Sequence, residues 1–306
     1  MNWKLKSALR RALLALPQGA ALYRCVTSRV LGTQHGMAAK WFRVFPAHVR
    51  VLKEKFGSEA RNVPLWCFDS GTTPAAGFAA AIVSDAEGLL SDRWNRLTDR
   101  YLGTSRGILS AQGAELAKIA DAPRGRFEQV CSAVAPARSS RQALAAVHMT
   151  YASSHDAAGS VPWRGRIGLV YSAGTFEHYT PAEVESALAV TSQALRPGGV
   201  LSHVVDHRDH RWHADKGISP LLHLALDDDV YLKKFGNPLD YHNRWMKSRW
   251  VECLERHGFE VEARTVIGMT GDLVPLPREK FASGFRSLSD EDIASLVTHF
   301  VAVKRD

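Results

Sequence analysis

The chain has 306 residues, of which 45% are hydrophobic and 23% are charged, and its net charge is +8. This composition is typical of a globular protein and excludes a disordered or collagen-like chain, while the length allows one large domain or two small ones. No apolar run reaches the roughly 18 residues that a membrane-spanning helix needs. The four cysteines are widely spaced and contain no CxxC motif, which excludes a zinc knuckle and a disulfide framework.

The positive charge is concentrated at the N-terminal end of the chain. Ten basic residues precede Glu54, which is the first acidic residue. Residues 54–306 carry the other 29 of the 39 basic residues and all 31 acidic ones, so this part is close to neutral. The basic pI of 9.4 therefore does not indicate a nucleic-acid-binding surface over the whole protein, and we do not expect a nucleic-acid partner.

Residues 3–16 have the pattern of an amphipathic helix. Its apolar residues form one stripe: Leu5, Leu9, Ala12, Leu13 and Leu16. Three interpretations remain open: the helix packs on the body of the protein, it lies on an anionic membrane surface, or it belongs to a cleaved targeting peptide. Residues 18–57 predict further short helices, which end at Gly32, Gly36 and Pro46. We expect a basic helical extension over residues 1–58 and a second domain over residues 59–306.

The rest of the chain alternates between apolar runs and helical patterns. The predicted strands cover residues 63–68, 89–92, 147–151, 167–172, 200–206, 259–267 and 296–304. The predicted helices cover residues 75–83, most of 93–150 with a loop at 123–126, 181–195 and 249–257. Thr180 and Glu183 form a capping-box pattern at the start of one helix, and Gly258 ends another. This alternation predicts a parallel sheet that is covered by helices on both faces.

Polar residues follow the first two predicted strands. Asp69, Ser70, Gly71 and Thr72 lie between the first strand and a helix, and Asp92 ends the next strand, 21 residues after Gly71. In open α/β sheets such a glycine turn approaches a ligand closely, and an acid at this spacing binds ribose hydroxyls. The sequence therefore predicts a nucleotide-like cofactor site, and the alternative is an ordinary turn beside a surface aspartate.

Three motifs in the second half of the chain carry a resemblance to a known family. They are IGLVYS at residues 167–172, Phe176-Glu177-His178, and LRPGG at residues 195–199. Over residues 60–305 the chain resembles the class I S-adenosylmethionine-dependent methyltransferases. The resemblance implies an α/β fold with a doubly wound, mostly parallel seven-stranded sheet and a terminal antiparallel strand, plus the helical N-terminal extension. It implies S-adenosyl-L-methionine as cofactor. The cofactor-binding residues that it implies are Asp69, Ser70, Gly71, Thr72, Asp92, Asp156, Ser172 and Glu177.

A second group of residues suits proton transfer from an acceptor. His178 follows one predicted strand, and His203, Asp206 and His210 lie around the end of another, where a histidine held by an aspartate would be a competent base. We predict these four as catalytic residues. A structural hydrogen-bond network and a metal site remain open alternatives, but the spacing matches no known metal motif, so we predict no metal.

The acceptor and the location depend on a narrower resemblance. Residues 203–210 with Asn243-Arg244 are similar to a subgroup of bacterial methyltransferases with basic N-terminal extensions, which implies a cell-surface glycan or lipid-linked context. We expect O-methylation of a small-molecule, glycan or lipid-linked acceptor. We expect a cytoplasmic protein, either free or bound to the inner face of the cell membrane through residues 1–16. Two departures leave an inactive membrane-surface or scaffold protein as the alternative: Thr72-Thr73-Pro74 replaces a second glycine, and Gly168 replaces an aspartate.

Overall fold

The structure, a computed structural model, describes residues 12, 16–19, 33–93, 95–153, 163–236 and 241–305, without the side chains of residues 33–37. The predicted helix over residues 3–16 lies almost entirely outside this part of the chain, and so does the membrane contact predicted for it. Among the described residues, none of the helices has the length and apolar character needed to cross a membrane.

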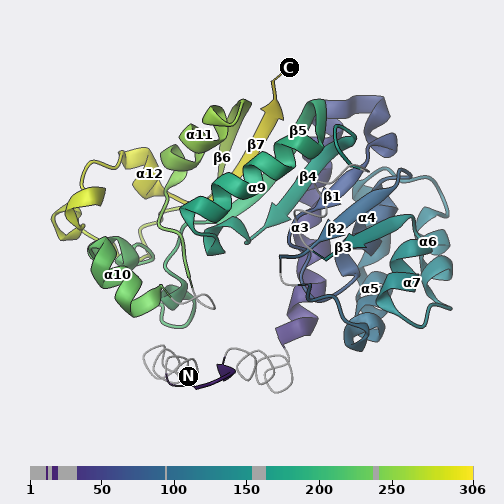
Figure 1. Cartoon of the computed structure of the whole chain (residues 1–306), viewed down its shortest axis with the longest axis horizontal. Coiled ribbons are helices and arrows are strands. Elements are labelled where there is room, and N and C mark those ends of the chain that lie inside the picture. The colour runs from purple at the N-terminus through teal and green to yellow at the C-terminus, as the bar shows by residue number, and fades with distance from the viewer. Residues whose placement is uncertain are drawn as a thin grey trace.

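Seven strands form one sheet in the order β3-β2-β1-β4-β5-β7-β6 (Figure 1). The strands are β1 (Leu65–Cys67), β2 (Gly88–Ser91), β3 (Met149–Ala152), β4 (Ile167–Ala173), β5 (Leu195–Asp206), β6 (Phe259–Gly268) and β7 (Ser295–Lys304). Strands β1 to β5 pair in parallel, whereas β7 runs antiparallel between β5 and β6. This confirms the predicted sheet, including its terminal antiparallel strand.

The helices cover both faces of the sheet. One hydrophobic core contains residues of α3 (Thr33–Phe56), α4 (Ala75–Val83), α5 (Leu102–Ile119), α6 (Arg126–Val134) and α7 (Ser140–Ala145). A second core contains α9 (Pro181–Ala194) and α11 (Lys247–Arg256). Leu65 and Cys67 belong to the first core and Trp66 to the second, as the alternation of side chains along a strand requires. The predicted capping box begins α9, where Thr180 Oγ1 accepts from the backbone N–H of Glu183.

Two further helices, α10 (Asp228–Phe235) and α12 (Asp290–Ala294), lie beyond the antiparallel end of the sheet (Figure 1). This region has a third, smaller hydrophobic core, with Leu221, Leu224 and Phe281 among its buried residues. The sequence patterns gave no assignment for residues 207–248, most of which form loops and short helical turns.

Helix α3 contradicts the prediction of short helices. It continues from Thr33 through Gly36 and Pro46 to Phe56. Proline inside a helix costs about 3 kcal/mol, but burial of one large apolar side chain contributes roughly 1.5–3 kcal/mol. Several such side chains of α3 are buried in the first core: Trp41, Phe42, Phe45, Val49 and Leu52. Burial against α4 and α5 therefore outweighs the local preference to end the helix, and α3 shares a core with the sheet. The domain boundary at residues 58 and 59 stays a prediction.

Two glycines on the exposed side of α5 provide a test of helix propensity. An added Cβ at Gly103 or Gly107 would meet no atom within 4 Å. We expect Gly103→Ala and Gly107→Ala each to raise the free energy of unfolding by about 0.5–1 kcal/mol, because glycine loses more backbone entropy than alanine. Urea denaturation measures the change. Gly113→Ala in the same helix is the control: its Cβ would lie 2.6 Å from the Phe127 ring, so it should destabilise.

Candidate cofactor site and histidine cluster

The loop after β1 and the end of β2 meet at the carboxyl edge of the sheet. Gly71 has φ +79°, and its N–H donates to Asp92 Oδ2 at 3.1 Å. The N–H of Ser70 donates to the carbonyl of Ser91 at 2.8 Å. The order of strands reverses between β1 and β4, and this is the position where open α/β sheets bind ligands. The structure thus brings Gly71 and Asp92 together at the expected edge.

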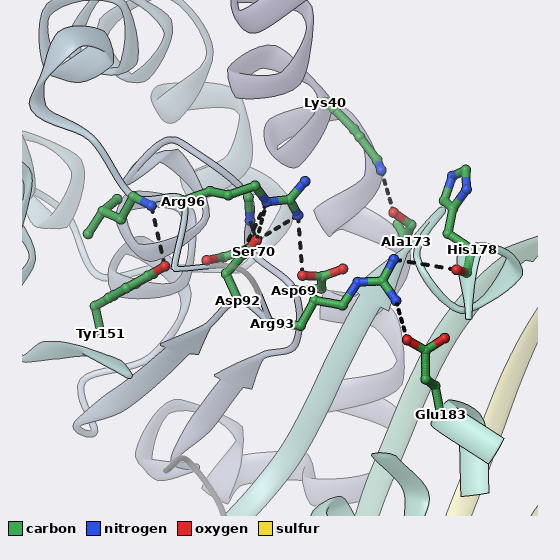
Figure 2. Close-up of polar contacts among 12 residues, drawn as sticks. Lys40, Asp69, Ser70, Asp92, Arg93, Arg96, Tyr151, Ala173, His178 and Glu183 are labelled. Atoms are coloured by element: carbon green, nitrogen blue, oxygen red, sulfur yellow. Dashed lines mark hydrogen bonds and ion pairs between the residues drawn. The ribbon is translucent and has the colours of Figure 1, made fainter. Parts of the chain in front are cut away.

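The guanidinium of Arg96 donates hydrogen bonds to both acidic residues of this edge (Figure 2). Its Nε is 3.0 Å from both oxygens of the fully buried Asp92, and its Nη2 is 2.7 Å from Asp92 Oδ2 and 3.3 Å from Asp69 Oδ1. Burial and the nearby Asp92 raise the pKa of Asp69 to about 6. Arg96 was not among the residues predicted for this site. Its position four residues after the predicted ribose acid could have indicated it.

Arg93 connects the β2 edge with the loop after β4 (Figure 2). Its guanidinium donates to Glu183 Oε1 at 3.3 Å and to the carbonyl of His178 at 3.4 Å. It also lies 4.2 Å from the centre of the Tyr179 ring. Arginine over an aromatic face with two acceptors is a well-anchored arrangement, so the loops that follow β2 and β4 are fixed relative to each other.

The other predicted cofactor residues differ in their surroundings. The carbonyl of Ser70 accepts from Trp41 Nε1 at 3.3 Å, and its hydroxyl is buried without a partner in the described part of the chain. The carbonyl of Thr72 accepts from Thr98 N–H at 3.2 Å. Ser172 Oγ lies 2.7 Å from His203 Nδ1. Asp156 lies outside the described residues.

Helix α3 contributes a lysine to this site. The ammonium of Lys40 donates to the carbonyl of Ala173 at the end of β4 (Figure 2), and burial lowers the pKa of Lys40. A Cβ on Gly174, where φ is +60°, would lie 3.1 Å from Lys40 Nζ and 3.2 Å from Glu177 Oε1. A side chain here would crowd both Lys40 and Glu177, in a backbone conformation that favours glycine. Glu177 is 3% exposed, and burial raises its pKa to about 8.

The structure gathers some of the predicted catalytic residues and separates others. The ring of His210 lies 4.8 Å from that of His178 and 4.2 Å from that of His242, centre to centre. His203 does not join them. It packs 4.4 Å from the Phe176 ring in the second core, and burial lowers its pKa to about 3.

Asp206 and His207 have structural partners. Arg208 donates to both oxygens of Asp206, at 2.8 and 2.7 Å, and His213 Nε2 is 3.3 Å away. Despite burial, these partners hold the pKa of Asp206 well below its usual range. His207 contacts the carbonyl of Trp245 and the hydroxyl of Thr298.

The buried histidines predict a loss of stability in acid. Burial lowers the pKa of His178, His207 and His299 from 6.5 to about 4, and that of His203 to about 3. Below pH 6.5 the unfolded chain binds protons that the folded chain excludes, so the free energy of unfolding falls as the pH falls toward 4. Asp69 and Glu177 act oppositely: their raised pKa values stabilise the fold in acid, and these contributions are lost as the pH rises through about 6 for Asp69 and about 8 for Glu177.

We therefore expect maximum stability near pH 6.5, because below that value the several buried histidines outnumber Asp69 and Glu177. Urea denaturation at intervals between pH 4.5 and 8 measures the profile. Constant stability below pH 6.5 would contradict histidines that are buried in their neutral form.

No protein-family model matches the chain, and no curated protein sequence matches it. Solved methyltransferase structures are similar to it. The carbon methyltransferase of CurJ is 15% identical with a TM-score of 0.41, over 83% of this chain and 51% of that one. Haemonchus contortus phosphoethanolamine N-methyltransferase 2, solved with S-adenosyl-L-methionine, is 15% identical with a TM-score of 0.46, over 93% of this chain and 60% of that one.

A methyltransferase from Mesorhizobium loti that is S-adenosylmethionine-dependent is 13% identical with a TM-score of 0.43, over 84% of this chain and 98% of that one. This chain thus spans about half the length of the CurJ structure and 60% of the Haemonchus enzyme, but nearly all of the Mesorhizobium one. The chain's own strand order, with β7 antiparallel, is the class I methyltransferase fold that the sequence motifs predicted.

Proposed function

We propose that the chain binds S-adenosyl-L-methionine and catalyses methyl transfer, to an oxygen of a small-molecule, glycan or lipid-linked acceptor. The observation that supports this most is the contact between the Gly71 N–H and the buried Asp92 carboxylate, at the point where the strand order reverses. It joins a glycine turn and a ribose-type acid in one site, as binding of a nucleoside requires.

The residues present fit such a cofactor. The unpartnered hydroxyl of Ser70 and the carboxylate of Asp92 offer hydrogen bonds at the ends of β1 and β2, and Glu177 offers a carboxylate after β4. When bound, S-adenosylmethionine supplies an electrophilic methyl group, while the protein supplies position and surroundings. Asp156 remains a proposed contact to the adenine.

Removal of a proton from an acceptor hydroxyl requires a base. Of the four residues predicted for catalysis, we retain His178 and His210 as candidates, because their rings lie together beyond the ends of β4 and β5. Burial lowers the pKa of both, so each is neutral at pH 7 and is a weaker base than a free imidazole. For His203 and Asp206 we now propose positioning roles, through Ser172 and His213 respectively.

One observation favours the alternative of an inactive fold. Arg96 donates to both oxygens of Asp92, so ribose hydroxyls would have to share or displace this arginine. A protein that has lost the cofactor would keep such an ion pair to stabilise the buried acid. The membrane role proposed for residues 1–16 would suit either function and is tested by flotation with anionic and neutral liposomes.

The melting temperature in the presence of S-adenosylhomocysteine distinguishes the two functions. A ligand at 100 times its Kd stabilises by about 2.7 kcal/mol, which for a protein of this size is roughly 5 °C. We expect a shift of this order for the methyltransferase. No shift at millimolar ligand would support the inactive alternative.

A further inference from the structure

Three potential metal ligands meet at the carboxyl ends of β4 and β5. Glu177 and His178 follow β4, and His210 follows β5. One ligand atom from each of the three lies within 4.8 Å of the others. A tetrahedral zinc site, with metal–nitrogen distances of about 2.0–2.1 Å, brings its ligand atoms to roughly 3.4 Å, so movements of about 1 Å would close this group around an ion.

The hydrogen bond of His178 leaves one ring nitrogen without a proton. Its Nδ1 lies 3.2 Å from the carbonyl of Tyr241. A carbonyl only accepts, so Nδ1 carries the proton and Nε2 keeps its lone pair. Metal-binding histidines almost always donate their second nitrogen to a carbonyl or carboxylate in this way.

Glu177 supplies an independent observation that points to a cation. Its side chain is 3% exposed, and its Oε2 has no hydrogen-bond partner in the described part of the chain. A buried polar oxygen without a hydrogen-bond partner is costly, and a bound cation would satisfy it. Asp206 adds negative charge nearby, whereas Lys40 is the positive group beside Glu177.

We propose that Glu177, His178 and His210 bind one divalent transition-metal ion. Two imidazoles and one carboxylate match the ligands of zinc and of iron(II), and they differ from the all-oxygen ligands that calcium and magnesium prefer. Three protein ligands leave at least one coordination position for another molecule, as in catalytic metal sites.

The sequence spacing could not reveal this group. His210 is 32 residues from His178, and the two meet only because β4 and β5 are parallel neighbours that end at the same edge. If the proposed function is correct, an ion here would take the place of a histidine base, because metal-bound His178 and His210 have no free nitrogen to accept a proton: the ion would bind the acceptor oxygen and lower the pKa of its hydroxyl. That role rests on the proposed function, whereas the site itself does not.

Cobalt(II) is the probe for this site, because its visible absorption reports ligand number and geometry. The full-length protein without an affinity tag is treated with a chelator, dialysed and titrated with Co²⁺, and bound metal is counted by mass spectrometry. We expect one Co²⁺ per chain with the absorption of a four- or five-coordinate ion. His178→Ala and His210→Ala should each weaken binding by at least about 100-fold, because even second-shell changes cost 10–100-fold.

Two further variants keep the test decisive. His257→Ala is the matched control, because His257 belongs to a separate group with Glu185 and Cys253. It should bind Co²⁺ like the wild type. Glu177→Gln retains the side-chain shape, so it replaces either histidine variant that fails to fold by circular dichroism. Absence of cobalt binding by the wild type, or loss of binding in His257→Ala alone, would overturn the proposal.

The proposed metal site and the proposed methyltransferase function can be tested independently of each other. The melting-temperature test with S-adenosylhomocysteine is repeated on the metal-free protein. Cofactor binding without cobalt binding would overturn the metal site and leave the proposed function in place. Cobalt binding without cofactor binding would support the site and overturn its role in methyl transfer.

Discussion

Replacement of Gly168 by aspartate, the residue usual at this position in the methyltransferases that the sequence resembles, is expected to destabilise the fold strongly. Gly168 is buried in β4, and an added Cβ would lie 2.4 Å from Val63 Cγ1. The side chain would have to displace Val63 and would also place a carboxylate in the interior. Overpacking typically costs 1–3 kcal/mol, and burial of the carboxylate adds to this even though Arg196 Nε lies 3.6 Å from the added Cβ, so we expect a loss of about 3 kcal/mol.

Soluble yield and urea denaturation followed by circular dichroism measure this effect. Gly271→Asp is the matched control, because Gly271 is exposed and an added Cβ would meet nothing within 4 Å. It should unfold at the wild-type urea concentration. A Gly168→Asp variant that unfolds there as well would contradict the packing described for β1 and β4. The expected result would attribute this departure from the family pattern to packing and not to lost activity.

The second large effect concerns the proposed cofactor acid. We expect Asp92→Asn to weaken binding of S-adenosylhomocysteine by about 100-fold, as measured by calorimetry. Loss of hydrogen bonds to a charged acceptor costs about 1.5–3 kcal/mol, and 2.7 kcal/mol corresponds to a factor of roughly 100. The variant also leaves Arg96 with only one carboxylate partner, so its fold must be checked by circular dichroism.

Asp85→Asn is the control for this experiment. Asp85 also pairs with arginine, at 2.7 Å from Arg61 and 3.2 Å from Arg126, but it lies beyond the other end of α4. Its affinity for S-adenosylhomocysteine should equal that of the wild type. Unchanged affinity in Asp92→Asn would remove Asp92 from the site even if the cofactor binds.

Most of the fold could be predicted because its signals are local. The strand at residues 167–172 is a continuous apolar run, and α9 begins with a capping box and is followed within five residues by Pro-Gly-Gly, which lies in β5. Helix α3 shows the limit of such signals. Pro46 predicts a break, whereas the helix persists because distant parts of the chain bury its apolar face.

The candidate site could be predicted only in part, for the same reason. Gly71 and Asp92 were identified because each follows its own strand. Lys40 could not be identified from the sequence, since it reaches the site from a helix that packs on α4 and α5. The sequence pattern also grouped His203 with His210, whereas His203 points into the core between Phe176 and Phe300.

Binding of methyl-labelled S-adenosylmethionine, measured by equilibrium dialysis, tests the central claim most directly. We expect one molecule to bind per chain, to be displaced by S-adenosylhomocysteine, and to be lost in Asp92→Asn but retained in Asp85→Asn. Absence of saturable binding by the folded wild-type protein at millimolar ligand would contradict the claim that this site holds the cofactor.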